Sequence, residues 1–134
     1  RDLNGFGGIG AQMPAYAGIL IFFSLASLGL PGLSGFISEF LVLLGGYQFN
    51  RLYTGLACIG IILAAAYLLY MIRRVLLGTL NTKWNTLTDI SARETFTLVP
   101  LMILILVVGI YPRVILHYMV PTLQGLLLSL GYTP

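Results

Sequence analysis

Long apolar runs separated by short polar segments make up most of the chain. One run covers 14–48 and contains a cluster of helix-breaking residues near 30–35. A second run, 52–72, has no charged residue and ends at Arg73 and Arg74. A helix needs about 20 apolar residues to cross the hydrocarbon core of a membrane. The pattern therefore predicts an all-α integral membrane protein with about three transmembrane helices, of which the first is discontinuous.

We expect one membrane segment over the whole chain, 1–134. The Gly-rich stretch 1–12 is predicted to be a loop, and the tail mixes Leu with polar residues, which is typical of a helix lying along the interface. So few spans form a thin bundle that needs partner helices, and a chain that begins with Arg1 is interpreted as a fragment, a processed chain or one piece of a split subunit. The predicted elements are a span at 14–48 broken near 30–35, spans at 52–74 and 92–112, and a tail at 113–134.

The composition supports this interpretation and excludes a water-soluble domain. Hydrophobic residues make up 58% of the chain, charged residues 8%, and the mean hydropathy is +0.96, whereas soluble domains carry about 25% charged residues. A net charge of +3 on so few ionisable groups gives no reason to expect nucleic acid as a partner. The sequence shows no metal-ligand cluster or phosphate-binding loop, so we expect no cofactor and no metal site in this chain.

The candidate chemistry is concentrated in one acid. Glu39 is the only charged residue between Leu3 and Asn50, and it follows Pro31, Gly32 and Gly35, which predict the helix break. A carboxylate at membrane depth is costly and suggests a function, and broken helices inside membranes line polar cavities. We therefore interpret Glu39 as a protonatable site. The alternatives are an acid near the interface and a structural partner for a Lys on another helix.

These residues resemble a known family. The stretch 26–40, ASLGLPGLSGFISEF, is similar to the broken helix of the antiporter-like subunits of respiratory complex I, the NADH:ubiquinone oxidoreductase. The resemblance runs in order over nearly the whole chain. Further matching stretches are 12–14, 65–67, 74–78, 93–94 and 109–112.

The acid also distinguishes among types within that family. Ser38-Glu39-Phe40 follows the pattern of the chain 4 type, whereas the chain 5 type usually has Lys at the position of Glu39. The resemblance implies that this chain is the C-terminal part of a proton-translocating membrane subunit, with Glu39 as the terminal protonatable residue of a half-channel. The family's other key residues, on earlier helices, have no counterpart here.

The resemblance carries further expectations about partners and location. The partners would be the rest of chain 4, the neighbouring antiporter-like chains 2 and 5, and membrane lipids. The cofactors of the whole complex, NADH, FMN, iron–sulfur clusters and ubiquinone, would be bound elsewhere. The expected location is the mitochondrial inner membrane, with the bacterial plasma membrane as the alternative.

Two other functions remain open at this point. The chain could be a subunit of a Mrp-type cation/proton antiporter, which shares the fold, or a structural membrane piece that scaffolds partner subunits. Copurification with an NADH-oxidising arm would distinguish a complex I subunit from a subunit of a Mrp-type antiporter. Substitution of Glu39 separates pumping from scaffolding.

The distribution of basic residues predicts the topology. Cytoplasmic or matrix loops carry an excess of Lys and Arg. Only Arg51 and Arg113 fall on the side that would carry the tail. The opposite side, formed by the N-terminal segment and the loop near 73–93, is therefore predicted to be cytoplasmic or matrix, and its basic residues are Arg1, Arg73, Arg74, Lys83 and Arg93.

The topology can be tested with single cysteines in a Cys58→Ser background. Thr82→Cys and Ser129→Cys should react with a membrane-impermeant thiol reagent from opposite sides of sealed vesicles, because the third predicted span, 92–112, lies between them. Permeabilised vesicles, in which both should react, serve as the control. Labelling of both sites from the same side would refute the three-span topology and the placement of Glu39.

Overall fold

The described part of the chain is helical. The computed structural model describes residues 6–79, 84 and 86–131, and these contain helices but no strand. The predicted all-α fold is therefore confirmed. The helices are α1 (Ile9–Gln12), α2 (Pro14–Ser27), α3 (Ser34–Phe49), α4 (Arg51–Leu76), α5 (Ala92–Ile110) and α6 (Arg113–Ser129).

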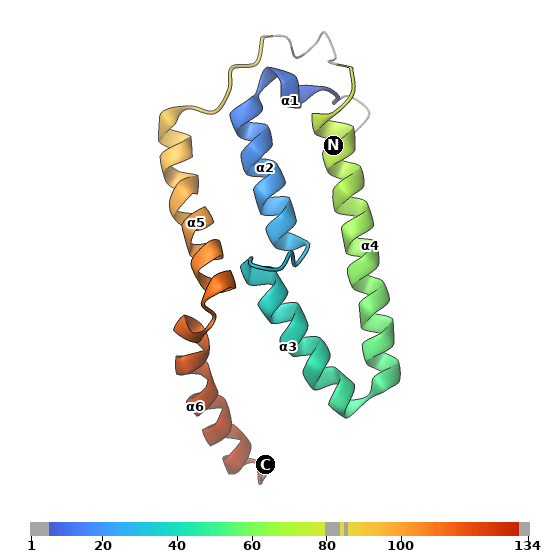
Figure 1. Cartoon of the computed structure of the whole chain (residues 1–134), viewed down its shortest axis with the longest axis vertical. Helices are drawn as coiled ribbons and strands as arrows, with labels where there is room; N and C mark the ends of the chain where they lie inside the picture. Colours follow the sequence, from blue (N-terminus) through green and yellow to red (C-terminus); the bar gives the residue numbers. More distant parts are fainter. Residues whose placement is uncertain (1–5, 80–83, 85, 132–134) are drawn as a thin grey trace.

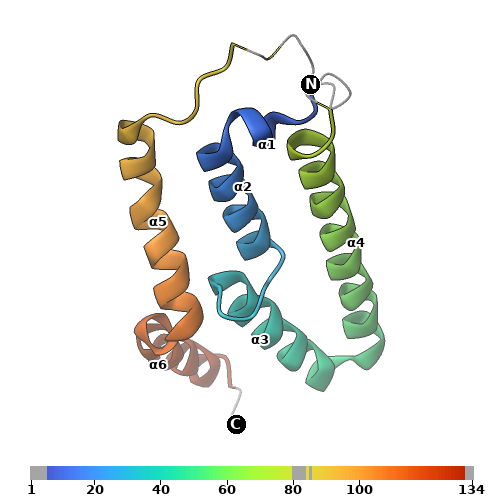
Figure 2. The same ribbon diagram turned by 45° about the horizontal axis from the view of Figure 1, so that its top comes forward.

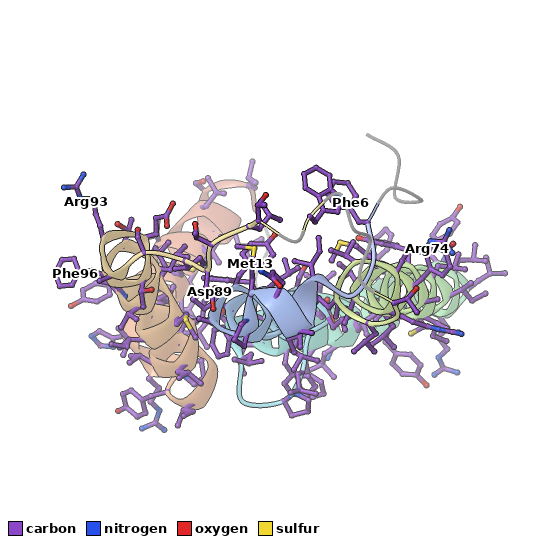
Figure 3. The ribbon with its side chains drawn as sticks, turned by 90° about the horizontal axis from the view of Figure 1, so that it is seen from above. Phe6, Met13, Arg74, Asp89, Arg93 and Phe96 are labelled. Carbon is purple, nitrogen blue, oxygen red and sulfur yellow. The ribbon has the colours of Figure 1, made fainter. Side chains whose placement is uncertain are left out.

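The helices form a thin row (Figure 1). Helix α2 lies between α4 and α5, and α3 continues beyond the end of α2 and leads back to the start of α4. Figure 2 shows the same order, with α6 turning away from α5. Seen from above, side chains project from both faces of this row (Figure 3). The first predicted helix is discontinuous, as expected, because residues 28–33 separate α2 from α3.

This arrangement leaves almost no hydrophobic core. Large side chains on α4 are mostly exposed, among them Leu52 at 67% and Ile62 at 67%. Within the described residues the buried hydrophobic side chains lie only at helix contacts, and they are Ile9, Ala17, Ala26, Leu33 and Leu76. A surface of this kind is suited to contact with lipid or with further helices.

Two helices, α4 and α5, are long and apolar enough to cross a membrane. Helix α4 has 26 residues, which corresponds to about 39 Å. Helix α2 is apolar but shorter, with 14 residues, or about 21 Å, less than the hydrocarbon thickness of about 30 Å. A crossing at this position would need α3 as well, and that pairing stays a prediction.

The expectation that 1–12 forms a loop is wrong for its last part. Residues 9–12 form α1, because Gly8 adopts a left-handed conformation with φ 66° that turns the chain into the helix. The Gly8 amide donates to the Leu77 carbonyl oxygen at 3.3 Å, and Ile9 and Leu76 are both buried there. Contact with the end of α4 therefore stabilises a helix that the Gly-rich sequence alone does not indicate.

Side-chain caps fix where two of the long helices begin. The Asn50 side chain accepts hydrogen bonds from the Leu52 and Tyr53 amides at 2.9 and 3.2 Å. The spacing of Ser91 and Glu94 in the sequence predicts a capping box, and the two residues form one at the start of α5. These local hydrogen bonds set the turn between α3 and α4 and the start of α5.

The segment before α5 is tied to the start of α2 by a carboxylate. Asp89 accepts hydrogen bonds from the Ala15 and Tyr16 amides at 2.8 and 3.0 Å, and from the Ile90 amide at 2.7 Å. Burial raises the pKa of the Asp89 carboxyl, but these three donors lower it by more, so the pKa lies below its usual value. The anion therefore satisfies amides at the first turn of α2.

The described parts of the N-terminal segment and of the loop near 73–93, which form the predicted basic side, lie at the same end of the row (Figure 1). Phe6 and Trp84 stack with ring centroids 5.3 Å apart, and Gln12 Nε2 donates to the Leu87 carbonyl oxygen at 3.2 Å. The end of α6 lies at the opposite end of the row. Arg1, Lys83 and the labelling site Thr82 lie outside the described residues.

Replacing Asp89 should loosen the start of α2. In Asp89→Ala, hydrogen exchange of the Ala15 and Tyr16 amides should become faster, because their acceptor is removed. In the wild type the contact should persist above the ordinary pKa of aspartate, about 3.9, and weaken as the pH falls through the lower folded value. Thr88→Ala, at the exposed neighbouring position, is the matched control. Unchanged exchange in Asp89→Ala would contradict the capping role.

Candidate functional site at the helix break

Helix α2 ends in a Schellman motif. Gly29 follows the last helical turn with φ +67°, a left-handed conformation that Gly adopts without steric cost. The Gly29 amide donates to the Ala26 carbonyl oxygen at 3.4 Å, and the Leu30 amide donates to the Leu25 carbonyl oxygen at 3.2 Å. This is the hydrogen-bond pattern of the motif, so the first half of the broken helix ends at Gly29.

The loop between the two halves contains Pro31 and Gly32. Pro31 cannot continue a helix, and Gly32 has φ +94°. Leu33 is extended, is 6% exposed and begins α3 without a side-chain cap. Its amide donates to the Leu30 carbonyl oxygen at 3.0 Å. Gly35, also predicted as part of the break, lies in the first turn of α3.

The two halves approach each other through residues without bulky side chains. A Cβ atom on Gly35 would overlap the Ala26 carbonyl oxygen and lie 3.4 Å from Gly29 Cα. Ala26 itself is buried. The start of α3 therefore lies directly on the end of α2, and Gly35 permits the contact.

Glu39 points back across the break. Its carboxyl group lies so close to Gly29 that a Cβ atom there would lie 2.7 Å from Glu39 Cδ. The side chain is half-buried. No ion pair to Glu39 is found among residues 6–79, 84 and 86–131. The only carboxyl group in the described part of the broken helix thus lies at the end of α2, beside the loop.

Helix α5 covers the other side of the loop. Gly109 is buried, and a Cβ atom on it would overlap the Gly32 carbonyl oxygen and lie 2.5 Å from the Leu33 backbone. This contact joins residues that are far apart in sequence. The loop is therefore contacted by α2, α3 and α5, while Leu30, Pro31 and Gly32 stay exposed.

The predicted site residues Glu39, Pro31, Gly32 and Gly35 come together at this break, and the sequence interpretation missed two others. Gly29 could have been found, because a Gly just after an apolar helix with a Pro two residues later is a C-terminal signal. Gly109 has no local signal, since its role depends on a contact with a distant loop.

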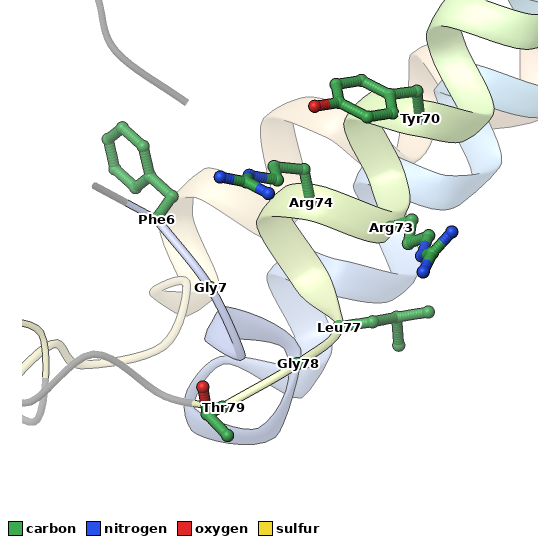
Figure 4. Close-up of a pocket in the computed structure, with 8 residues that line it drawn as sticks. All are labelled: Phe6, Gly7, Tyr70, Arg73, Arg74, Leu77, Gly78 and Thr79. Atoms are coloured by element: carbon green, nitrogen blue, oxygen red, sulfur yellow. The ribbon is translucent and has the colours of Figure 1, made fainter. Parts of the chain in front are cut away.

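Two surface hollows lie away from the break. The first, about 570 Å³, lies at the C-terminal end of α4 and is lined by Phe6, Arg73 and Arg74 among others. Figure 4 shows the Arg74 guanidinium on the side of Phe6 and Arg73 pointing away from it. The second, about 760 Å³, follows α6 around His117. Glu39 lines neither hollow, so the candidate site at the helix break lies outside both.

The chemical group that the broken helix offers at the break is the carboxyl group of Glu39. No group of three His, Cys, Asp or Glu side chains that could hold a metal is found in the part of the chain that the structure describes. A carboxyl group can accept and donate a proton. The fold is thus that of an all-α membrane protein with one discontinuous helix. In membrane transport proteins, discontinuous helices form ion and substrate sites.

The chain belongs to the NADH:quinone oxidoreductase/Mrp antiporter transmembrane family, whose profile matches residues 1–65. It is 41% identical over 127 residues to "NADH-quinone oxidoreductase subunit M" of Rhodobacter capsulatus, covering 94% of this chain and 25% of that protein. It is 39% identical over 127 residues to "NADH-ubiquinone oxidoreductase chain 4" of Arabidopsis thaliana, covering 94% of this chain and 26% of that protein. The chain thus spans about a quarter of the length of these relatives.

Gly29→Ala tests the geometry of the break. The substitution forces a Cβ atom into a left-handed conformation, at a cost of about 1–2 kcal/mol, and displaces the Glu39 carboxyl group. The thermal midpoint of the purified protein should fall. Gly18→Ala is the control, because Gly18 lies inside α2 with no atom within 4 Å of its Cβ position. Equal thermal midpoints for the two variants would contradict the contact.

Proposed function

We propose that this chain forms the C-terminal part of a proton-translocating, antiporter-like membrane subunit of an NADH:quinone oxidoreductase. Glu39 is the terminal protonatable residue of its half-channel. The observation that carries the proposal is the placement of the Glu39 carboxyl group against Gly29 at a helix break.

The break gives Glu39 a polar surrounding within an apolar helix. Breaking the helix frees backbone groups that water or neighbouring helices must satisfy. The start of α3 has no side-chain cap, so its first amides are available to such partners. A carboxyl group beside hydrated backbone groups can exchange protons with water at a depth where an isolated acid could not.

This chain supplies only one end of the proposed path. A buried carboxylate without a partner is costly, and the described residues contain no cation paired with Glu39. We expect the partner to be a Lys on a helix outside this chain. The translocation of protons is therefore assigned to the assembled subunit.

The alternatives differ in what they explain. The matching profile covers both oxidoreductase and Mrp antiporter proteins, so it does not separate them. The relatives that match over 94% of the chain are named as oxidoreductase subunits, and this favours the first assignment. A purely scaffolding role would explain the exposed apolar faces but gives no reason for a carboxyl group at the break.

The proposed assembly follows from the same observations. The exposed apolar faces of α4 and α5 would be covered by lipid and by the rest of chain 4, with chains 2 and 5 as neighbouring subunits. Helix α6 would lie along the interface against one of them. The redox groups, namely NADH, FMN, iron–sulfur clusters and ubiquinone, would be bound elsewhere in the complex. The complex would reside in the mitochondrial inner membrane or a bacterial plasma membrane.

Glu39→Gln tests the proposal in the assembled complex. The amide keeps the shape of the side chain but cannot exchange a proton, so assembly should be preserved while proton pumping and the coupled quinone reductase rate fall. Glu39→Asp should be milder, because it keeps a carboxylate. Pumping is measured in sealed vesicles together with NADH oxidation.

Glu94→Gln is the matched control for that experiment. It makes the same carboxyl-to-amide change in a capping box that accepts Gln as well as Glu, so it should leave pumping unchanged. Full pumping by a correctly assembled Glu39→Gln complex would refute the assignment of Glu39 as the terminal protonatable residue.

A further inference from the structure

We propose that Gly109 on α5 is a positioning residue for Glu39. It fixes the loop of the helix break from the side opposite α2 and thereby fixes where α3 places the carboxyl group. The inference rests on the proposed function of Glu39, and it adds a residue from a distant helix to that site.

The contact between Gly109 and the loop is made by backbone atoms. A Cβ atom on Gly109 would overlap the Gly32 carbonyl oxygen and lie 2.5 Å from Leu33 C and Cα. Backbone atoms cannot rotate away as a flexible side chain could. Any residue larger than Gly at 109 must therefore move the loop or move α5.

A displacement of the loop would move Glu39, because only the short hydrogen-bonded segment from Leu33 onward separates them. Leu33 is hydrogen-bonded on both sides, its amide to the Leu30 carbonyl oxygen at 3.0 Å and its carbonyl oxygen to the Phe36 amide at 3.2 Å. One residue after α3 begins, Gly35 lies on the Ala26 carbonyl oxygen. Glu39 follows one turn later. Moving Leu33 therefore moves the start of α3 and changes the separation of the Glu39 carboxyl group from Gly29.

Several glycines at other helical positions have free space around them, whereas Gly35 shares with Gly109 a tight backbone contact at the break. Gly45 in α3, Gly60 in α4 and Gly125 in α6 have no atom within 4 Å of their Cβ positions. Gly109 also lies at the end of α5, where the chain turns into α6 (Figure 1). The tight backbone contact of α5 therefore lies at the point where this helix meets the break.

The experiment uses the intact complex in its membrane. Gly109→Ala adds one methyl group at the contact, and Leu33→Ala instead removes a buried side chain from the same place. Gly45→Ala is the matched control on the helix that carries Glu39. Each variant is made in the wild type and with Glu39→Gln. The readouts are the amount of assembled complex, protons pumped per electron pair, and the pH profile of the coupled rate.

We expect Gly109→Ala and Leu33→Ala to assemble, to pump fewer protons per electron pair and to shift the pH profile, whereas Gly45→Ala behaves like the wild type. In the Glu39→Gln background neither should cause a further loss, because both act through that carboxyl group. A full additional loss there would overturn the inference, as would wild-type pumping by assembled Gly109→Ala.

The remaining outcomes are also decisive. If Gly109→Ala does not assemble, Leu33→Ala decides, and wild-type pumping by that variant overturns the inference. Failure of both to assemble would make the contact a folding requirement and overturn the positioning role. If Glu39→Gln pumps fewer protons but Gly109→Ala pumps normally, only this inference is overturned. If Glu39→Gln itself pumps normally, the proposed function is overturned and this inference with it.

Discussion

The close approach of backbone to backbone at the helix break is the constraint on which the candidate site depends. Gly29, Gly35 and Gly109 each lie where a Cβ atom would collide with a neighbouring segment. Backbone groups freed by a break at membrane depth must be covered by protein or water. Here α2, α3 and α5 approach the loop closely at Gly29, Gly35 and Gly109, and Glu39 is the ionisable side chain that the described residues place beside it.

Helix α2 is held at both ends by contacts with other elements. At its start, Asp89 accepts hydrogen bonds from the first amides, and at its end the Schellman motif leads into the loop that Gly109 covers. One contact comes from the segment before α5 and the other from the end of α5, so α2 and its loop are linked to this part of the chain near both ends of α2. A movement of α5 would therefore displace the loop at the break.

The thin row of helices supports the proposal that this chain acts within a larger assembly. Exposed apolar side chains occur on both faces, and the chain spans about a quarter of the length of its relatives. A path across a membrane has to be enclosed on all sides. Under the proposed function, the described helices would provide one wall of such a path and the acid that lies on it.

Local patterns in the sequence determined most of the helices. The apolar runs predicted α4 and α5, the Pro and Gly cluster predicted the discontinuity between α2 and α3, and the Ser91–Glu94 pair predicted a capping box that the structure contains. Glu39 was identified by its isolation in an apolar run. These features depend on residues within about one helical turn or on burial of whole segments, so the sequence carries them directly.

Only the tertiary structure decided what surrounds those features. The short helix α1 lies against the end of α4, where the Gly8 amide donates to the Leu77 carbonyl oxygen. Asp89 likewise reaches Ala15 from 74 residues away. The contact of Gly109 with Leu33 likewise joins segments that no periodicity relates. The physical reason is that helix formation is governed by neighbours three and four residues apart, whereas the choice of which helices touch depends on the fit of their surfaces after they have formed.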